Sequence, residues 1–168
     1  EDTGQENIIP DLKKIKAAGK HLLSLINDVL DLSKIEAGKM ELFLERFAIK
    51  DMIDDVIGTT RPLIHQKGNQ LEVDFLGDID TMYADLTKTR QILFNLLSNA
   101  SKFTDSGVIR LVVSNEFKEH IGWIVFSVID SGIGMNEDQM SRIFDSFSQA
   151  DDSTTRNYGG TGLGLTIT

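Results

Sequence analysis

The segment RQILFNLLSNASKFT, residues 90–104, is the most informative stretch of the sequence. Its apolar side chains recur at steps of three and four, which predicts an amphipathic helix from Leu86 to Phe103. Asn95, Asn99 and Lys102 follow the same spacing on another face, so two carboxamides and one ammonium are aligned. The side chains expected to turn toward the core are Ile92, Leu93, Leu96 and Leu97.

This polar helix face has two interpretations. An Asn carbonyl oxygen is a suitable hard ligand for Mg²⁺, and a nearby Lys can contact the phosphates that the ion bridges. The alternative is a solvated face, because polar residues opposite an apolar stripe are the rule in surface helices. The segment alone leaves both open.

A second segment, DSGIGM at residues 130–135, follows a stretch rich in Val, Ile and Phe. Asp130, at the end of a predicted strand, could accept a hydrogen bond from an exocyclic amine such as adenine N6. Gly132 and Gly134 would let the backbone approach such a ligand closely. The alternative is a tight strand-to-helix turn that the Asp side chain caps.

A third segment, GGTGLGL at residues 159–165, is rich in glycine. Successive glycines ahead of a helix can present N–H groups and the positive helix end to phosphates. The spacing is not that of a Rossmann fingerprint, and the Lys that closes a Walker loop is missing. A flexible hinge is the alternative. The polar residues 146–158 between the two glycine-rich segments indicate a lid over a ligand site.

Around these segments the sequence predicts alternating strands and helices within one core. Period-two patterns predict strands at 40–45 and 71–75. Two stretches rich in Val, Ile and Phe, at 108–114 and 121–129, predict an antiparallel pair of strands. Further helices are predicted at 49–64 and 137–143.

Residues 1–38 are expected to form a separate helical element that begins near Pro10. Apolar residues recur at steps of three and four from Ile15 to Leu32, and neighbouring leucines and isoleucines widen this stripe. The pattern is typical of a bundle helix, and it stops at Gly38. One helix cannot bury such a face alone, so the element is expected to need partners.

Composition narrows the classes of function. The formal net charge of the 168 residues is −9, which argues against general nucleic-acid binding, because such binding depends on clustered Lys and Arg. A phosphate site must therefore use local devices such as a divalent cation, backbone N–H groups and a few basic residues. The absence of cysteine excludes disulfides and thiolate sites. No apolar run is long enough to span a bilayer.

Taken together, the motifs closely resemble the nucleotide-binding boxes of sensor histidine kinases of the GHKL type. The matching motifs are Asn-x-x-x-Asn-x-x-Lys-Phe at 95–103, Asp-x-Gly-x-Gly at 130–134, Phe-x-x-Phe at 144–147 and Gly-x-Gly-x-Gly at 160–164. They correspond to the asparagine, first glycine, phenylalanine and second glycine boxes. The segment 18–39 is similar to the second stalk helix of the same family, so the resemblance begins near residue 11, and we expect a hybrid kinase.

The resemblance implies an α/β two-layer sandwich of the Bergerat type, a mixed sheet with helices on one face, preceded by a bundle helix. Residues 1–39 would be the second helix of an incomplete dimerisation stalk. Residues 40–168 would be the ATP-binding catalytic domain without its C-terminal elements. We expect ATP and Mg²⁺ as ligands, and a homodimer, a phosphoacceptor helix and a response regulator receiver domain as partners. A cytoplasmic location is expected, with any membrane attachment through regions outside this chain.

The resemblance also implies a role for each matching residue. Asn99 would coordinate Mg²⁺, and Asn95 would assist directly or through water. Lys102 would contact phosphate, and Arg156 in the lid would reach the terminal phosphate unless it is an exposed loop arginine. Asp130 would bind the adenine amine. Around the nucleotide we expect Phe103, Gly132, Gly134, Met135, Phe144, Phe147, Gly160, Thr161, Gly162, Leu163 and Gly164, although the phenylalanines at 144 and 147 also suit a core.

The chain departs from the family at the acceptor histidine. The family carries it in a His-Glu/Asp-x-x-Thr/Asn-Pro pattern on the first stalk helix, and this sequence has no such pattern. His21, His65 and His120 are instead expected to be structural or solvent-facing. The fragment alone is therefore expected not to autophosphorylate.

The expected function is transfer of the terminal phosphoryl group of ATP to a histidine in two-component signal transduction. One alternative is a nucleotide-binding regulatory module that gates a partner without phosphotransfer. Another is a hydrolytic ATPase of the same superfamily, as in gyrase, mismatch-repair or heat-shock proteins. Those enzymes generally carry a Glu one turn before the magnesium Asn, where this chain has Asn95, so hydrolysis is the less favoured reaction.

Overall fold

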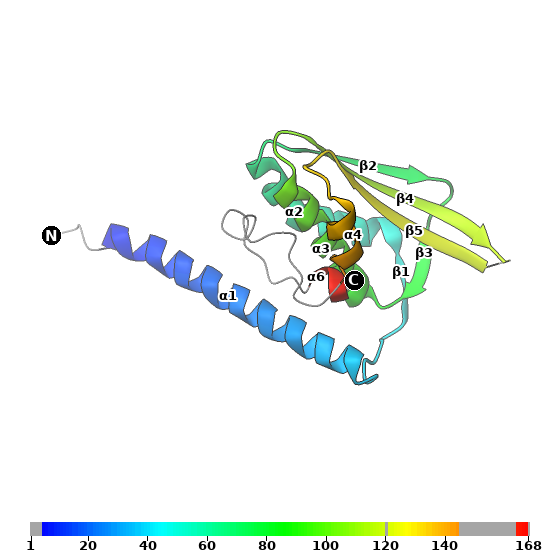
Figure 1. Ribbon diagram of the computed structural model, residues 1–168, viewed down its shortest axis with the longest axis horizontal. Helices are drawn as coiled ribbons and strands as arrows, with labels where there is room; N and C mark the ends of the chain where they lie inside the picture. Colours follow the sequence, from blue (N-terminus) through cyan, green and yellow to red (C-terminus); the bar gives the residue numbers. More distant parts are fainter. Residues whose placement is uncertain (1–4, 120, 145–163, 168) are drawn as a thin grey trace.

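The computed structural model describes residues 5–119, 121–144 and 164–167 (Figure 1). Its helices are α1 (Gln5–Glu36), α2 (Ile49–Gln66), α3 (Leu86–Phe103), α4 (Glu137–Arg142) and α6 (Gly164–Ile167). Its strands are β1 (Glu45–Ala48), β2 (Gln70–Leu76), β3 (Thr81–Ala84), β4 (Val108–Lys118) and β5 (Ile121–Asp130). Within these ranges, no helix combines the length and the apolar character that a membrane crossing requires.

Three strands form a mixed sheet in the order β2-β4-β5. β2 runs parallel to β4, with Gln70 opposite Val108, and β4 runs antiparallel to β5, with Ile109 opposite Asp130. The predicted mixed sheet and its antiparallel pair are confirmed. β1 and β3 form a separate two-stranded antiparallel sheet.

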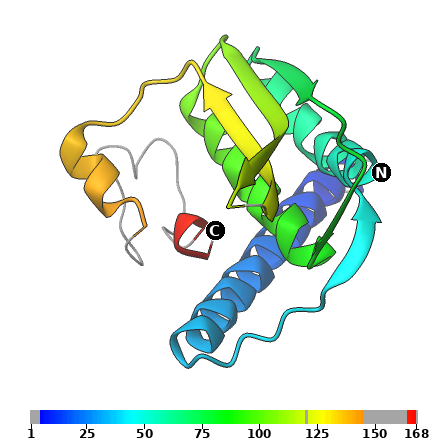
Figure 2. The ribbon, with the colours of Figure 1, turned by 90° about the vertical axis from the view of Figure 1, so that its right-hand side faces the viewer.

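Helices α2 and α3 cover one face of the three-stranded sheet, as Figures 1 and 2 show. Side chains alternate along β4, so Ile109, Leu111 and Val113 are fully buried against the helices, whereas Arg110 is exposed on the other face. Arg110 pairs there with Glu72, at 2.7 Å between Nη2 and Oε2. The expected two-layer α/β sandwich is therefore confirmed. Its remaining core residues are Ile49, Met52, Ile53, Val56, Ile57, Ile64, Ile79, Leu93, Leu97 and Ala100.

Helix α1 extends away from the sandwich over much of its length (Figure 1). It begins at Gln5, earlier than predicted, and continues through Pro10. Its apolar stripe remains largely exposed, with Ile15 at 68% and Leu22 at 59%. Near its end Leu32 is buried, so this part of the helix packs on the rest of the chain.

The two-stranded sheet of β1 and β3 differs in two details from the prediction. The strand predicted at 40–45 is wrong, because residues 40–44 have no regular structure and β1 begins at Glu45. The N–H of Phe43 donates to Asp85 Oδ2 at 2.9 Å, which removes it from any strand ladder. The partner strand β3 was not predicted at all. The other predicted helices and strands are confirmed, with β4 longer than expected.

Candidate functional site

Helix α3 starts at a well-formed cap. Asp85 is its N-cap residue, and its Oδ1 accepts from the N–H of Lys88 at 2.9 Å. Its other carboxylate oxygen accepts from Phe43, and these backbone donors, Lys88 first, hold the pKa of Asp85 below its ordinary value. The cap fixes the residue at which the helix begins. The start of the helix in turn sets the positions of the later residues along it.

The polar face of α3 has the predicted arrangement, but two of the four side chains predicted to turn toward the core, Ile92 and Leu96, are only half-buried and are not among the core residues. Leu93 and Leu97 are buried toward the sheet, whereas Asn95, Asn99 and Lys102 are half-buried at the surface. The mixed exposure leaves these polar side chains available to a ligand while their backbone is held by the core.

Asn95 joins α3 to the end of the second glycine segment. Its Nδ2 donates to the carbonyl oxygen of Gly164 at 3.3 Å. Gly164 is the first residue of α6, which packs against α3 (Figure 2). A Cβ built on Gly164 would lie 3.7 Å from the Asn95 carboxamide, which is ordinary contact distance. The close approach therefore does not depend on Gly164 being a glycine.

Lys102 occupies the last turn of α3 in a partly buried position. Its Nζ lies 4.7 Å from the ring centroid of Phe103, a cation–π distance. Burial lowers the pKa of Lys102, and the nearby positive charge of Lys67 lowers it further. A phosphate placed here would favour the charged form of Lys102, because an anion opposes both effects.

The first glycine loop is attached to the end of α3. The N–H of Ile133 donates to the carbonyl oxygen of Phe103 at 3.3 Å. Ser131 and Val108 exchange two more bonds, from Ser131 N to Val108 O at 3.2 Å and from Val108 N to Ser131 Oγ at 2.9 Å. Within the loop, Asp130 Oδ1 accepts from the N–H of Gly132 at 2.9 Å. The asparagine and first glycine motifs thus form one continuous surface.

At two positions of this loop, the structure explains why the residue is glycine. A Cβ on Gly132 would lie 2.5 Å from the Phe103 carbonyl oxygen and 2.7 Å from Asp130 Oδ1, so a side chain does not fit. Gly134 has φ +69°, a backbone conformation that other residues rarely adopt. The loop geometry therefore favours glycine at both predicted positions, for lack of space at Gly132 and for the backbone conformation at Gly134.

Beyond the loop, the chain turns into α4. Asn136 caps this helix in a reciprocal capping box with Gln139. Met135 and Phe144, which were predicted to surround a nucleotide, are exposed at 50% and 64%. Neither is packed in the core, so the core alternative is wrong for Phe144.

The turn after α2 supports the end of α3, a role that its sequence does not predict. Lys67 Nζ donates to the carbonyl oxygen of Lys102 at 2.6 Å. The buried Asn69 donates to Thr104 O and accepts from Gly107 N, both at 2.9 Å. The sequence indicates only a helix end at these residues, and no local pattern tells which distant segment they contact.

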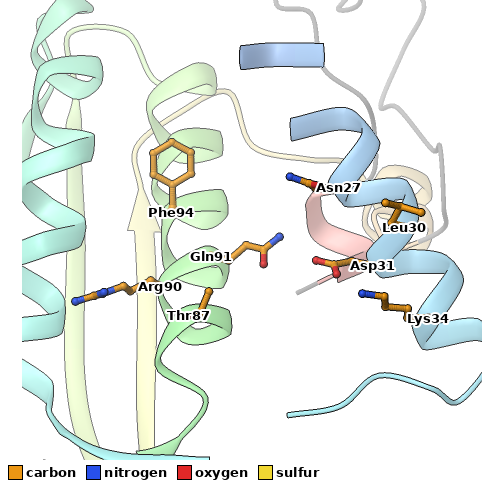
Figure 3. Close-up of a pocket in the computed structure, with 8 residues that line it drawn as sticks. All are labelled: Asn27, Leu30, Asp31, Lys34, Thr87, Arg90, Gln91 and Phe94. Carbon is orange, nitrogen blue, oxygen red and sulfur yellow. The ribbon is translucent and has the colours of Figure 1, made fainter. Parts of the chain in front are cut away.

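A groove of about 510 Å³ lies elsewhere, between α1 and α3 (Figure 3). Asp31 in this groove accepts from Lys88 Nζ at 2.7 Å, which ties the end of α1 to α3. Neither Asn99 nor Lys102 lines it, so it is distinct from the predicted site. Its lining residues are Asn27, Leu30, Asp31, Lys34, Thr87, Arg90, Gln91 and Phe94.

Several predicted positions lie outside the described residues, namely Phe147, Arg156, Gly160, Thr161, Gly162 and Leu163. His120 and the side chain of His21 lie outside them as well, and His65 is exposed as expected. The described part of the site therefore consists of the α3 face, the first glycine loop and the start of α6.

One protein family matches this part of the chain. Residues 84–168 match the model of the histidine kinase-, DNA gyrase B-, and HSP90-like ATPase family. The matched segment contains α3, β4, β5 and both glycine-rich segments.

Curated proteins of known name are similar over nearly the whole chain. The autoinducer 2 sensor kinase/phosphatase LuxQ of Vibrio cholerae is 41% identical over 90% of this chain and 18% of its own length. The signal transduction histidine-protein kinase BarA of Escherichia coli is 40% identical over 94% of this chain and 17% of its own length. The chain thus spans less than a fifth of these relatives.

A solved structure has the same fold. Full-length ShkA in complex with AMPPNP superposes with a TM-score of 0.76 at 34% identity, over 94% of this chain and 32% of ShkA. The arrangement of α2, α3 and the mixed sheet is therefore one already found in a nucleotide-bound protein.

Proposed function

The chain belongs to the family of histidine kinase-, DNA gyrase B- and HSP90-like ATPases, and on this premise we propose that it is the ATP-binding catalytic part of a sensor histidine kinase. It would bind ATP with Mg²⁺ and pass the terminal phosphoryl group to a histidine of a phosphoacceptor domain. The similarity to LuxQ and BarA, which are both named as kinases, supports this proposal over a module without phosphotransfer.

One observation carries the proposal: both glycine-rich segments contact the same helix. Gly164 accepts from Asn95, and Ile133 donates to Phe103, so the two segments meet α3 on either side of Asn99 in the sequence. A ligand next to Asn99 would then be within reach of backbone N–H groups, carboxamides and an ammonium, which suits a nucleotide.

We propose the following division of roles. Asp130 would accept a hydrogen bond from the adenine amine, since its carboxylate is exposed at the loop and held by Gly132. Lys102 would contact the phosphates, and Phe103 would pack near the base. By resemblance, Arg156 would reach the terminal phosphate. Met135, Phe144, Phe147, Gly160, Thr161, Gly162 and Leu163 would complete the surroundings.

The side chains present suit Mg²⁺ better than a metal that needs several protein ligands. Within the described ranges, no three His, Cys, Asp or Glu side chains gather into a metal-binding group. Asn99, with Asn95, would therefore offer one or two amide oxygens and leave the other positions to phosphate and water, which is how Mg²⁺ is commonly held. The ion, when bound, neutralises charge that develops on the phosphoryl oxygens.

The reaction would be an in-line displacement at the γ-phosphorus. An unprotonated imidazole nitrogen forms the N–P bond while the bond from phosphorus to the β,γ-bridging oxygen breaks. ADP leaves with the electron pair of that bond, and the remaining ring N–H proton can pass to solvent. The contribution of Asn95, Asn99 and Lys102 would be to position and stabilise the phosphates rather than to exchange covalent bonds.

Partners follow from the same proposal. The exposed apolar stripe of α1 would pack in a stalk with a second copy and with the helix that carries the acceptor histidine. A response regulator receiver domain would take the phosphoryl group from that histidine.

Binding of Mg-ATP, followed by titration calorimetry, tests the site directly. Asn99→Ala and Asp130→Ala should each weaken affinity by about tenfold or more, because each removes a polar contact in a partly desolvated site. Asn115→Ala, an exposed residue on β4, is the matched control and should bind as the unaltered chain does. Undiminished affinity in both site variants would rule out this site.

Phosphotransfer separates a kinase from a regulatory module. The chain is incubated with labelled ATP, alone and with a stalk domain that carries the acceptor histidine pattern. Acid-labile, base-stable phosphate is expected on the added stalk and not on the chain itself. Nucleotide binding without any transfer to the stalk would favour the regulatory function.

A further inference from the structure

Lys67 is the charged member of the turn that supports the end of α3. It is the C-cap residue of α2, and its Nζ donates to the carbonyl oxygen of Lys102 at 2.6 Å. The last carbonyl groups of a helix lack partners within the helix, and a cation near them interacts favourably with the helix dipole. Lys67 therefore holds the backbone of the residue whose ammonium would contact phosphate.

Neighbouring hydrogen bonds fix this turn in place. The N–H of Ser106 donates to Lys67 O at 3.0 Å, and the N–H of Gln70 donates to Gly107 O at 2.8 Å. Asn69 bridges Thr104 and Gly107 from its buried position. Because bonds on both sides of Lys67 hold the backbone, its half-buried ammonium has a defined place against α3.

The titratable groups on the elements around Lys102 differ in their effect on its pKa. They are Lys67 and His65 at the end of α2, Asp105 after α3, and Asp130 on the first glycine loop. Of these described groups, only the Lys67 charge acts on the pKa of Lys102, and it lowers that pKa in addition to the larger effect of burial. At the end of α3, Lys67 and Lys102 thus bring two ammonium groups close enough to interact, in a chain whose net charge is −9.

We propose that Lys67 is a positioning residue of the nucleotide site, which holds the last turn of α3 and adds a second positive charge beside Lys102. The inference rests on the proposed function, because it assigns Lys67 to the phosphate side of that site. Two neighbouring ammonium groups repel each other, and a phosphate anion relieves the repulsion. Nucleotide binding is thus favoured by the charge of Lys67, although Lys67 need not touch the ligand.

Three substitutions separate the hydrogen bond of Lys67 from its charge. Lys67→Met removes both, Lys67→Gln keeps an N–H donor without the charge, and Lys67→Arg keeps both. Lys50→Met is the matched control, because Lys50 lies at the opposite end of α2 with its ammonium 5.8 Å from the Phe75 ring centroid.

Affinity for Mg-ATP, from titration calorimetry, is the first measurement. Lys67→Met is expected to bind about tenfold more weakly, the scale of one charge-assisted hydrogen bond. Lys67→Arg should restore most of this affinity, and Lys50→Met should leave it unchanged. Normal affinity in Lys67→Met would overturn the inference. If the unaltered chain failed to bind Mg-ATP, the proposed function itself would be wrong.

The pKa of Lys102 is the second measurement, taken from a pH titration of its side-chain NMR signals, which Lys102→Arg assigns. Without nucleotide, the pKa of Lys102 should be higher in Lys67→Gln and Lys67→Met than in the unaltered chain. A merely structural role of Lys67 would not produce this rise. Equal pKa values in Lys67→Gln and the unaltered chain would refute the electrostatic role, even if Lys67→Met did not fold.

Discussion

The N–H of Ile133 donates to the carbonyl oxygen of Phe103 at 3.3 Å, so the first glycine loop is attached directly to the last residue of α3. Lys102 is the preceding residue of the same helical turn. A disturbance of the loop is therefore transmitted to the end of α3 where phosphate contact is proposed. Changes at this junction should affect nucleotide affinity and folding stability together.

Gly132→Ala tests this junction. The new Cβ would lie 2.5 Å from the Phe103 carbonyl oxygen, which is backbone and cannot rotate away. We expect the free energy of unfolding in urea to fall by about 1–3 kcal/mol, the usual cost of overpacking, and Mg-ATP affinity to fall with it. Gly58→Ala is the control, because a Cβ there meets nothing within 4 Å on helix α2, and it should stabilise by about 0.5–1 kcal/mol. Equal stability of Gly132→Ala and the unaltered chain would contradict this close packing of the loop on Phe103.

Asp85 should make folding stability depend on pH. Its folded-state pKa is lowered by the N–H groups of Lys88 and Phe43, so the ionised carboxylate stabilises the fold. This contribution is fully present above the ordinary carboxyl pKa and is lost as the pH falls through the lower folded value. Asp85→Ala is therefore expected to cost about 1–2 kcal/mol in urea unfolding at neutral pH.

The same substitution should cost much less in strong acid, where Asp85 is protonated in the folded chain as well. Asp85→Asn keeps one acceptor oxygen without the charge, so it should lose less stability and show a weaker pH dependence. A loss of equal size for Asp85→Ala at neutral and strongly acidic pH would show that the carboxylate charge has no part in the cap.

Asn69→Ala should be strongly destabilising. The side chain is 1% exposed and satisfies Thr104 O and Gly107 N, both of which would be left without this partner. Leaving buried backbone groups unsatisfied predicts a loss of about 2–4 kcal/mol in the free energy of unfolding. Asn115→Ala on the surface of β4 should change it by less than about 0.5 kcal/mol. A similarly small effect for both variants would argue against the bridge.

The ion pair between Asp31 and Lys88 should couple α1 to α3. Its side chains are only 15% and 26% exposed, and the oxygen and nitrogen lie 2.7 Å apart (Figure 3 labels Asp31). A double-mutant cycle with Asp31→Asn and Lys88→Met is expected to give a coupling energy of about 1 kcal/mol that falls with added salt.

The exposed pair Asp11 and Lys14 on α1 serves as the comparison for that cycle. Its side chains are 68% and 79% exposed, so its coupling energy should stay below about 0.5 kcal/mol. If the two pairs gave the same coupling energy, the contact between α1 and α3 would contribute nothing specific.

Much of the fold follows from local patterns in the sequence. The predicted bounds of α3, Leu86 to Phe103, agree with the structure, because its apolar spacing is regular and Asp85 offers a cap. The antiparallel pair of β4 and β5 was predicted from two long stretches of β-branched and aromatic residues. A long segment with one clear hydrophobic period is compatible with few other assignments of secondary structure.

The remaining differences arise from contacts between distant residues. β1 and β3 have only four residues each, so neither shows a clear period, and the alternation of Leu42 and Leu44 was more visible than the true strand. The bond from Lys67 to Lys102 joins residues 35 positions apart. The resemblance predicted which residues form the site, but not the contact of the turn after α2 with the end of α3.

The parallel pairing of β2 with β4 bears on the order of folding events. Parallel neighbours cannot be joined by a tight hairpin, and here the connection between them contains β3 and α3. Closing a long loop is slow compared with forming a helix locally. Helix α3 can therefore form early during refolding, whereas Asn95 and Phe103 meet their partners only after the sheet has closed. Recovery of nucleotide affinity should then mark a late step, after most of the helical signal has returned.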